Sequence, residues 1–201
     1  MSISKGYNAS NASSYRHNLK IDEYRISNVA RWTSGFTPTA VPYVNDANTL
    51  LLLHADNNSF IDSSSYGRAM QQLNSEALNF NNFGKFNYHN YLSVPHCEDF
   101  NFGNGAFTIE FMIYKKYSVA TSNGNPFIAH YTSSNTTGWS MHLYGGDGGM
   151  CFNYWNNGVL LGINANQVLG PDKWHHIAVV RQANDAIRMY INGVEATYYA
   201  Y

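Results

Sequence analysis

Residues 106–114 read AFTIEFMIY, and this stretch decides the fold class of the 201-residue chain. Its large apolar residues recur at every second position, at Phe107, Ile109, Phe111 and Ile113. A period of two with β-branched and aromatic residues predicts a strand in a sheet that is buried on one face. Glu110 falls on the opposite face. We expect backbone or hydroxyl groups to satisfy its carboxylate, which makes it a structural rather than a catalytic residue.

Hairpin signals extend this pattern toward the C-terminus. Strand-like segments alternate with turns rich in Gly and Asn: WSMHLY (139–144), MCFNYW (150–155), VLLGI (159–163), AIRMYI (186–191) and VEATYYAY (194–201). Asn and Gly supply the positive φ angles that tight hairpin turns need. Strand-length segments that recur about every 8–12 residues predict an all-β sandwich or barrel.

The beginning of the chain is less regular. We expect three parts, namely a flexible N-terminal arm, a strand with an extended proline-containing connection, and the main β-domain, at residues 1–18, 19–48 and 49–201. The strand of the second part is LKIDEYRIS (19–27). Met70–Leu78 is the best candidate for a short helix in a chain that otherwise lacks helical periodicity.

Composition excludes several classes of protein. Charged residues make up 12% of the chain and the formal net charge is −1, against about 25% charged residues in an average protein. Such a chain lacks the basic field that nucleic-acid binding requires. A hydrophobic content of 44% argues against disorder. The longest aliphatic run, Leu50–Leu53, is far shorter than the ~20 residues of a membrane span. We therefore expect neither a nucleic-acid partner nor membrane insertion.

The N-terminal residues and the cysteines indicate the compartment. The start, MSISKGYNASNASS, has no apolar core of a signal peptide. We expect synthesis in a cytoplasm without export by the signal-peptide route. Two cysteines do not make a disulfide framework, so we expect Cys97 and Cys151 to be free, partly buried thiols.

Four longer segments resemble a known family. They are TLLLLHADNNSFIDSSSYG (49–67), YLSVPHCEDFNFGNGAFTIEFMIY (91–114), KWHHIAVVRQ (173–182) and IRMYINGVE (187–195). Their order is typical of a concanavalin A-like, laminin-G-like jelly-roll domain, and the chain resembles most closely the versions common in bacteriophage virion proteins. The resemblance implies an all-β sandwich of two curved antiparallel sheets.

One segment departs from the family order. IDEYRISNVARWTSGFTP (21–38) is similar to the segment that ends such domains, yet here it precedes the domain. Three arrangements are open. Residues 19–27 close their own sandwich, they close a neighbouring copy in a swapped oligomer, or they complete an absent upstream domain. An open sheet edge invites aggregation, which favours the first two.

The resemblance also brings glycoside hydrolases into consideration. Hydrolysis needs two carboxylates that flank the bond, and hydrolases of this fold carry an E-x-D-x-x-E pattern on one strand. No two of the 13 acidic residues here are spaced i, i+2. The adjacent His175 and His176 point to opposite faces of a strand, so they cannot chelate one ion. We expect no enzymatic activity and no resident cofactor.

Calcium is the remaining candidate ion. Many laminin-G-like domains bind it at the rim of the sandwich through Asp side chains and backbone carbonyls. Asp56 and Asp62 bracket the first turn of this domain, and Asp22 begins the displaced strand. These positions do not match a family calcium motif residue by residue. We interpret them as solvated turn acids and leave the metal site open.

Two functions fit these observations. The first is a structural component of a phage virion, such as a decoration, fibre or tail subunit, assembled as a homo-oligomer or with other virion proteins. The second is a carbohydrate-binding adhesion module for host surface glycans. Tyr144 and Trp155, at the ends of predicted strands, are the candidate sugar-binding residues. Trp139, Tyr154 and Asn156 lie in the same hairpin region.

Overall fold

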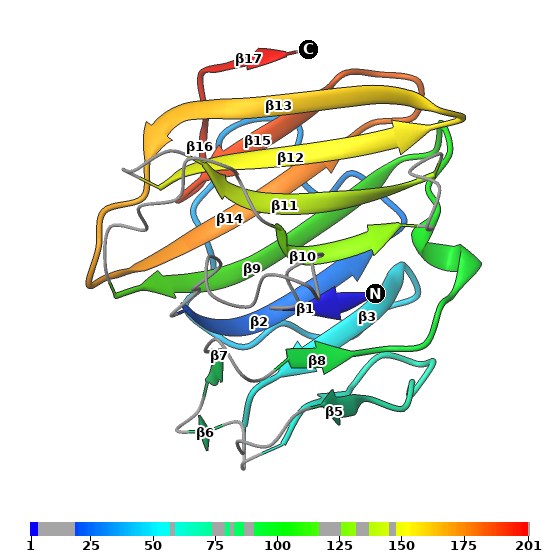
Figure 1. The fold of residues 1–201 in the computed structure, drawn as a ribbon, viewed down its shortest axis with the longest axis vertical. Helices are drawn as coiled ribbons and strands as arrows, with labels where there is room; N and C mark the ends of the chain where they lie inside the picture. The colour runs from blue at the N-terminus through cyan, green and yellow to red at the C-terminus, as the bar shows by residue number, and fades with distance from the viewer. Residues whose placement is uncertain are drawn as a thin grey trace, which may run out of the picture.

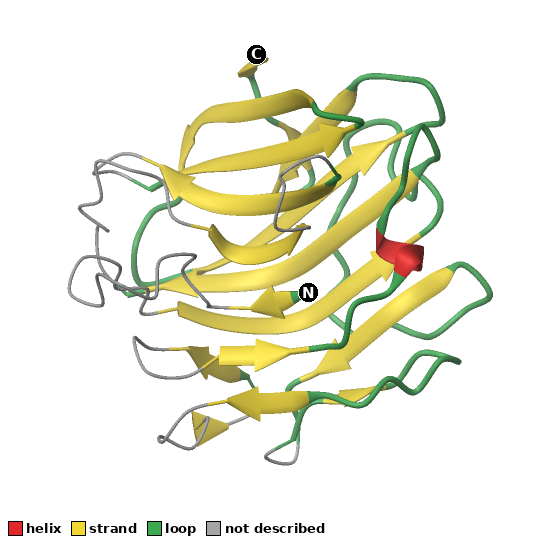
Figure 2. Cartoon of the chain, turned by 45° about the vertical axis from the view of Figure 1, so that its right-hand side comes forward, coloured by secondary structure: helices red, strands yellow, loops and turns green. Residues whose placement is uncertain are grey.

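A computed structural model describes residues 1–3, 19–56, 59–73, 79–80, 83–86, 91–116, 126–131, 137–144 and 148–200. In these residues the chain forms strands and a single 3₁₀ turn, η1 (Glu98–Phe100). The strands make two antiparallel layers that face each other, and Figure 2 shows η1 at the side of these layers. This confirms the expected all-β sandwich of two antiparallel sheets. No helix in the described part is long and apolar enough to cross a membrane.

Sheet A contains eight described strands in the order β17–β13–β12–β11–β10–β1–β8–β5 (Figure 1). Their bounds are β1 (Ser2–Ile3), β5 (Gln71–Leu73), β8 (Tyr91–Ser93), β10 (Pro126–Tyr131), β11 (Gly138–Tyr144), β12 (Gly149–Asn156), β13 (Val159–Val168) and β17 (Tyr198–Ala200). The hairpins β11–β12 and β12–β13 are those that the glycine- and asparagine-rich turns predict.

Sheet B contains nine described strands. Its main path is β16–β15–β14–β9–β2–β3–β4, while β7 pairs with the beginning of β2 and β6 pairs with β7. Their bounds are β2 (Leu19–Ser27), β3 (Thr49–His54), β4 (Ile61–Asp62), β6 (Asn79–Phe80), β7 (Gly84–Phe86), β9 (Phe107–Lys115), β14 (Trp174–Arg181), β15 (Ile187–Ile191) and β16 (Val194–Glu195).

The core lies between the two sheets and is rich in aromatic residues. The alternating apolar residues of β9 all face it with no exposed surface, namely Phe107, Ile109, Phe111 and Ile113. From sheet A, Trp139 is fully buried against them, and its indole nitrogen donates to the carbonyl of Phe100 at 3.1 Å. Full burial of such side chains stabilises the fold by about 1.5–3 kcal/mol each.

Strand β2 occupies the middle of sheet B. It pairs antiparallel with β9 on one side and with β3 on the other, so that Ile21 lies opposite Ile113 and Tyr24 opposite Leu53. The displaced N-terminal strand thus closes its own sandwich, which is the first of the three arrangements that the sequence leaves open. A bulge between Asp22 and Arg25 interrupts its pairing with β9.

Residues 28–48, which we call the strap, cross the outer face of sheet B without forming a strand, as their prolines predict. The backbone N–H of Phe36 donates to the carbonyl of Gly193 at 2.8 Å, at the turn between β15 and β16. Trp32 and Phe36 stack with ring centroids 3.8 Å apart and pack on the outer-face cluster of Ala178, Val180 and Tyr190. The strap therefore covers one part of this face as a second, smaller apolar layer.

Two expectations at the N-terminal half differ from the structure. The sequence predicts a short helix at Met70–Leu78. Gln71–Leu73 instead form the edge strand β5, which pairs with β8. Residues 74–78 lie outside the described residues. Residues 2–3 of the expected flexible arm form β1 between β10 and β8, where Ile3 is 1% exposed. The rest of that arm, residues 4–18, lies outside the described part.

Candidate binding surface

Glu110 lies at the centre of a buried polar cluster between sheet B and the strap. Its Oε1 accepts hydrogen bonds from Nε and Nη2 of Arg25, at 2.9 and 2.6 Å, and its Oε2 accepts one from the indole of Trp32 at 2.9 Å. The expectation of backbone or hydroxyl partners was wrong, because a guanidinium and an indole from the preceding part of the chain fill those positions. Glu110 has no exposed surface, so its carboxylate is structural.

The two adjacent histidines have separate surroundings, as expected for neighbours on a strand. His176 faces the strap, where its Nε2 lies 2.7 Å from the hydroxyl oxygen of Tyr43. His175 contacts the connection between β13 and β14, with its Nε2 3.0 Å from the carbonyl oxygen of Gly170. The amide nitrogen of Asn192 lies 3.2 Å from Nδ1 of His175. The ring of His176 thus contacts a side chain of the strap, and the ring of His175 contacts the backbone of the β13–β14 connection.

Of the three acids considered for calcium, Asp22 and Asp62 bind backbone groups of the fold, whereas Asp56 is exposed. Asp62 is 4% exposed, and its oxygens accept the backbone N–H groups of Leu52, Ser64 and Arg68 at 2.9–3.2 Å. It is therefore a buried anchor of the β3–β4 turn, which corrects its interpretation as a solvated acid. Asp22 accepts the N–H of Glu23 at 2.8 Å. Among the described residues, no group of three or more His, Cys, Asp or Glu side chains could hold a metal ion. Cys97 and Cys151 are both free thiols, as expected.

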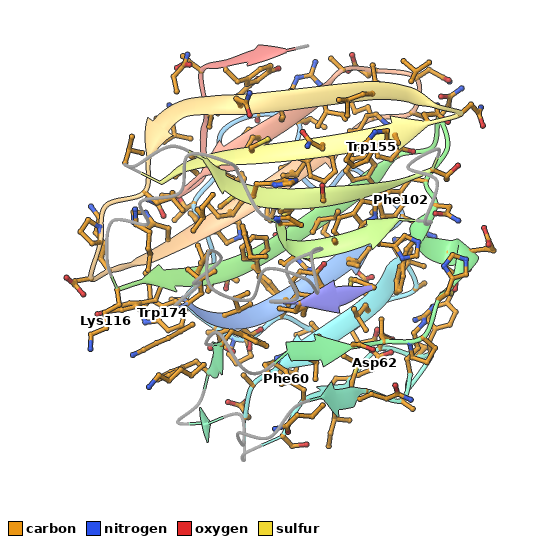
Figure 3. All side chains as sticks on the ribbon, in the orientation of Figure 1. Phe60, Asp62, Phe102, Lys116, Trp155 and Trp174 are labelled. Carbon is orange, nitrogen blue, oxygen red and sulfur yellow. The ribbon has the colours of Figure 1, made fainter. Side chains whose placement is uncertain are left out.

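The structure does not bring Tyr144 and Trp155 together. Tyr144 ends β11 opposite Gly149, whereas Trp155 lies opposite Gly138 at the beginning of β11. Six residues of extended strand separate these ends by about 20 Å. Trp155 is half-buried at the end of the molecule opposite to Trp174 (Figure 3). The side chain of Tyr144 lies outside the described part of the chain.

The neighbouring aromatic residues of this hairpin belong to the core. Trp139 has no exposed surface and Tyr154 is 2% exposed, with its hydroxyl donating to the carbonyl of Gly103 at 2.7 Å. Asn156 donates to the side-chain oxygen of Asn104 at 2.8 Å. The strand period explains this division, because Trp139 and Tyr154 lie opposite each other on the inner face.

A different group of aromatic residues gathers at one end of sheet B. Lys85, Lys20, Tyr114 and Trp174 lie in register across β7, β2, β9 and β14. Residues that oppose each other on paired strands share a face of the sheet, and this row is on the outer face. Phe83 precedes β7 and contacts the same row. We call Lys20, Phe83, Tyr114 and Trp174 the aromatic patch.

The members of the aromatic patch hold one another at fixed angles. The ring of Trp174 meets those of Tyr114 and Phe83 edge to face, with centroids 5.6 and 5.8 Å apart. The ammonium of Lys20 lies 4.2 Å from the centroid of Phe83 and 4.5 Å from that of Tyr114, which are cation–π contacts. Trp174 remains 37% exposed. The result is a braced cluster that keeps part of an indole open to solvent.

Strand β7 positions Phe83. Gly84 follows it and pairs with Ile21 of β2. A Cβ at Gly84 would overlap the ring of Phe60, which itself stacks on buried Phe86 with centroids 5.8 Å apart. Only glycine lets the backbone approach this ring pair so closely. The packing below β7 therefore fixes the place from which Phe83 reaches over Lys20.

The connection between β13 and β14 positions the other side of the patch. Leu169 is fully buried, and the contact of His175 with the carbonyl of Gly170 holds the turn. Asp172 has φ of 57° and donates its N–H to the carbonyl of Lys115 at 2.8 Å. Its carboxylate also accepts the hydroxyl of Tyr114 at 3.3 Å. These contacts place the carboxylate of Asp172 at the hydroxyl of Tyr114, whereas the side chain of Lys173 lies against Gly170.

Sequence reasoning missed this patch. The sequence does place Tyr114 at the end of one family-like segment and Trp174 at the beginning of the next. If the two segments are assumed to pair as antiparallel strands, these two residues are expected to lie at the same end of the sheet. Their register is set by long-range pairing of β9 with β14. Phe83 carries no local signal, since it stands in a polar, asparagine-rich stretch.

A scan against family models matches residues 86–201 to the concanavalin A-like lectin/glucanases superfamily. The match covers more than half of the chain, and the protein belongs to this superfamily. Neither the search of curated proteins nor the search of solved structures found a match. Tyr114 and Trp174 lie within the matched region, whereas β2 and the strap lie before it.

Proposed function

We propose that the protein is a non-catalytic glycan-binding β-sandwich that holds sugar rings on the aromatic patch. The observation that carries the proposal is the braced cluster of Tyr114, Trp174 and Phe83 around Lys20. A sugar ring has an apolar C–H face that packs on an aromatic ring, and a polar rim that needs hydrogen-bonding groups. Lys20 and Asp172 supply a donor and an acceptor beside the rings. Membership of a superfamily that includes lectins supports the same assignment.

The distribution of acidic residues supports a binding role without hydrolysis. Glycoside hydrolysis needs two carboxylates, about 5–9.5 Å apart, on either side of the scissile bond. The eight described strands of sheet A contain no Asp or Glu. On sheet B, Glu110 is buried and bonded to Arg25 and Trp32. At the aromatic patch, the carboxylate of Asp172 accepts the hydroxyl of Tyr114.

Replacing Trp174 by alanine tests the proposal. A glycan array identifies a bound sugar, and calorimetric titration then compares Trp174→Ala with Trp155→Ala as the matched control. We expect Trp174→Ala to weaken binding by about tenfold or more, as for an aromatic anchor, and Trp155→Ala to leave it unchanged. Both variants are checked for folding by circular dichroism. Unchanged affinity in a folded Trp174→Ala protein would contradict the proposal.

We also propose that the module serves as a structural subunit of a phage virion, joined to copies of itself or to other virion proteins. The supporting observation is an exposed apolar tip on the β12–β13 hairpin. Val159, Leu160 and Leu161 are 59%, 37% and 42% exposed, although they are consecutive aliphatic residues. Such a tip suits a protein contact, and the family-like segments resemble phage virion domains.

Light scattering behind size exclusion tests the self-association. We expect an oligomer for the native sequence and a lower mass for Val159→Ser combined with Leu161→Ser. A monomer at all concentrations would contradict self-association. The location of the protein in the virion is tested by mass spectrometry of phage particles, which are purified from a host in which the gene for this protein is expressed. Absence of the chain from intact particles would contradict it.

A further inference from the structure

Strand β1 fills a narrow slot in sheet A. Its residues Ser2 and Ile3 pair antiparallel with β10 on one side and with β8 on the other, as Figure 1 shows. Beyond the slot, β10 pairs with β11, and β8 pairs with β5. Among the described strands, β1 is therefore the element that joins the β8–β5 pair to the rest of sheet A.

The slot binds β1 through its backbone and through two apolar side chains. The backbone nitrogen of Met1 donates to the carbonyl of Val94 at 3.0 Å, and the N–H of Val94 donates to the carbonyl of Met1 at 3.1 Å. Ile3 is 1% exposed and lies in the core between the sheets, where Met1 also packs. The sulfur of Met1 accepts the hydroxyl of Tyr24 at 3.5 Å. The site is thus specific but short.

An empty slot would be unfavourable for the sandwich. Without β1, strands β10 and β8 would present open edges in the middle of sheet A, and such edges pair readily with another strand. The side chains beside the slot are apolar and buried, since Leu92, Val94 and Ile128 are at most 2% exposed. The slot therefore suits an extended segment that carries one aliphatic anchor, in the manner of a strand added to a sheet.

The connection between β1 and β2 is long enough for β1 to reach a second copy of the chain. Residues 4–18 join Ile3 in sheet A to Leu19 in sheet B. Fifteen residues reach up to about 50 Å when extended, which is about three times the radius of gyration, roughly 16 Å, of a domain of 201 residues. By contrast, β2 is a nine-residue strand that is paired on both sides.

Exchange of β1 between two copies would form the same contacts again. The hydrogen bonds and the burial of Ile3 are identical in its own slot and in that of a neighbour, so the two arrangements differ only in the cost of bringing the copies together. Short linkers give a tethered strand a local concentration on the order of millimolar at its own slot. A neighbour's strand therefore competes when the copies reach that concentration or lie side by side in an assembly.

From this placement we propose that the slot between β10 and β8 is an assembly site, which receives residues 1–3 of a second copy of this chain when copies are close together. Each insertion completes sheet A of one copy with a strand of the other. The inference is separate from the proposed self-association through the tip of the β12–β13 hairpin, because it uses a different part of sheet A. It also leaves β2 in its own sandwich.

Disulfide formation can report which chain fills the slot. Met1 and Val94 form a hydrogen-bonded pair, so the next opposed residues, Ser2 and Ser93, form a non-hydrogen-bonded pair. The Cα atoms of such a pair are about 4.5 Å apart, which is within the range of a disulfide. The test mixes a protein that carries Ser2→Cys with one that carries Ser93→Cys in a thiol–disulfide buffer. A link between the two proteins requires that β1 of one copy lies in the slot of the other.

The matched control replaces Ser93→Cys by Gln71→Cys. Gln71 lies opposite Ser93 on the far side of β8, so two strand spacings, about 10 Å, separate it from Ser2. Peptide mass spectrometry identifies the linked residues, because the free thiols of Cys97 and Cys151 are also present. A further protein carries Ser2→Cys and Ser93→Cys in one chain, and circular dichroism checks the folding of every variant.

At about 1 mM protein we expect a covalent dimer linked between positions 2 and 93, with a yield that falls about tenfold or more at about 10 μM. The Gln71→Cys control is expected to form no link to position 2. An internal link in the double variant, with no link in the mixture at about 1 mM, would overturn the exchange. Equal yields from the control would overturn it as well, because they would indicate random collision. Absence of any link between positions 2 and 93, within or between chains, would overturn the position of β1 and the exchange together.

Discussion

Replacing Glu110 by glutamine tests whether the buried ion pair stabilises sheet B and its strap. Glutamine keeps the shape of the side chain but removes the charge that balances Arg25, which is 8% exposed. It also presents an amide N–H₂ where a carboxylate oxygen accepts a hydrogen bond from Arg25 or Trp32. Loss of one partner from a buried pair costs about 3–5 kcal/mol.

This loss of unfolding free energy corresponds to a lower melting temperature, Tm. For a domain of this size, 1 kcal/mol lowers the Tm by about 2–4 °C, so we expect Glu110→Gln to lower it by roughly 6–20 °C. The double variant Glu110→Gln with Arg25→Met removes the unpaired charge and should melt above the single variant. Differential scanning calorimetry measures all three proteins. A drop of less than about 3 °C, or a double variant that melts below Glu110→Gln, would refute the reasoning.

The same pair predicts an acid-dependent stability. Burial raises the pKa of Glu110, but His176, Arg25 and Trp32 lower it by more, so its pKa lies below the usual 4.5. Because the pKa of Glu110 is lower in the folded protein than in the unfolded chain, its contribution to the free energy of unfolding is complete above about pH 4.5. This contribution is lost as the pH falls through the folded-state pKa. Urea unfolding at about pH 7 and about pH 3.5 should therefore show a smaller loss for Glu110→Gln than for the native protein.

Three further predictions concern other parts of the fold. Gly193 and Gly158 have similar φ angles, 78° and 80°. A Cβ at Gly193 would overlap the carbonyl of Phe36 in the strap, whereas a Cβ at Gly158 would meet no atom within 4 Å. Urea unfolding should show a cost of about 1–2 kcal/mol for Gly158→Ala and about 3 kcal/mol or more for Gly193→Ala; equal costs would contradict the proposed strap contact. Burial lowers the pKa of His130 to about 3. Below about pH 6.5 the unfolded chain protonates this histidine and the folded protein does not, so the free energy of unfolding declines as the pH falls from about 6.5 toward 3. NMR should show no His130 titration between about pH 8 and 5, and a midpoint near 6.5 would contradict its burial. Because Asp62 already accepts three backbone N–H groups, millimolar calcium or a chelator should leave the Tm unchanged; a calcium-dependent rise would contradict this.

Local patterns were sufficient to predict most of the fold. Strand β9 and the hairpins follow from side-chain period and turn residues, which act over a few positions. The strap followed from Pro38 and Pro42, which disfavour sheet pairing. The edge strand at Gln71–Leu73 was mistaken for part of a helix because a three-residue strand is too short to show a period.

The candidate site could not be predicted in the same way. Tyr114 and Trp174 meet because β9 pairs with β14 in one register, and a shift of one residue would place them on opposite faces. Tyr144 and Trp155 were grouped because both stand at strand ends, yet strand direction places those ends about 20 Å apart. Glu110 received its partners from a strand and a strap that precede it by some 80 residues. Register and long-range closure are properties of the assembled sheets.

The central place of β2 has a consequence for the order in which the chain folds. Arg25 is 85 residues before its partner Glu110, and synthesis at about 5–20 residues per second takes roughly 4–17 s to cover that distance. During this interval β2 can pair with β3, but its other edge waits for β9. We therefore expect slow folding of the kind that distant strand pairing imposes. A rearranged gene that begins at residue 49 and places residues 19–48 last would synthesise the central strand after both of its neighbours, and the nascent chain would then carry that unpaired edge for the shortest time.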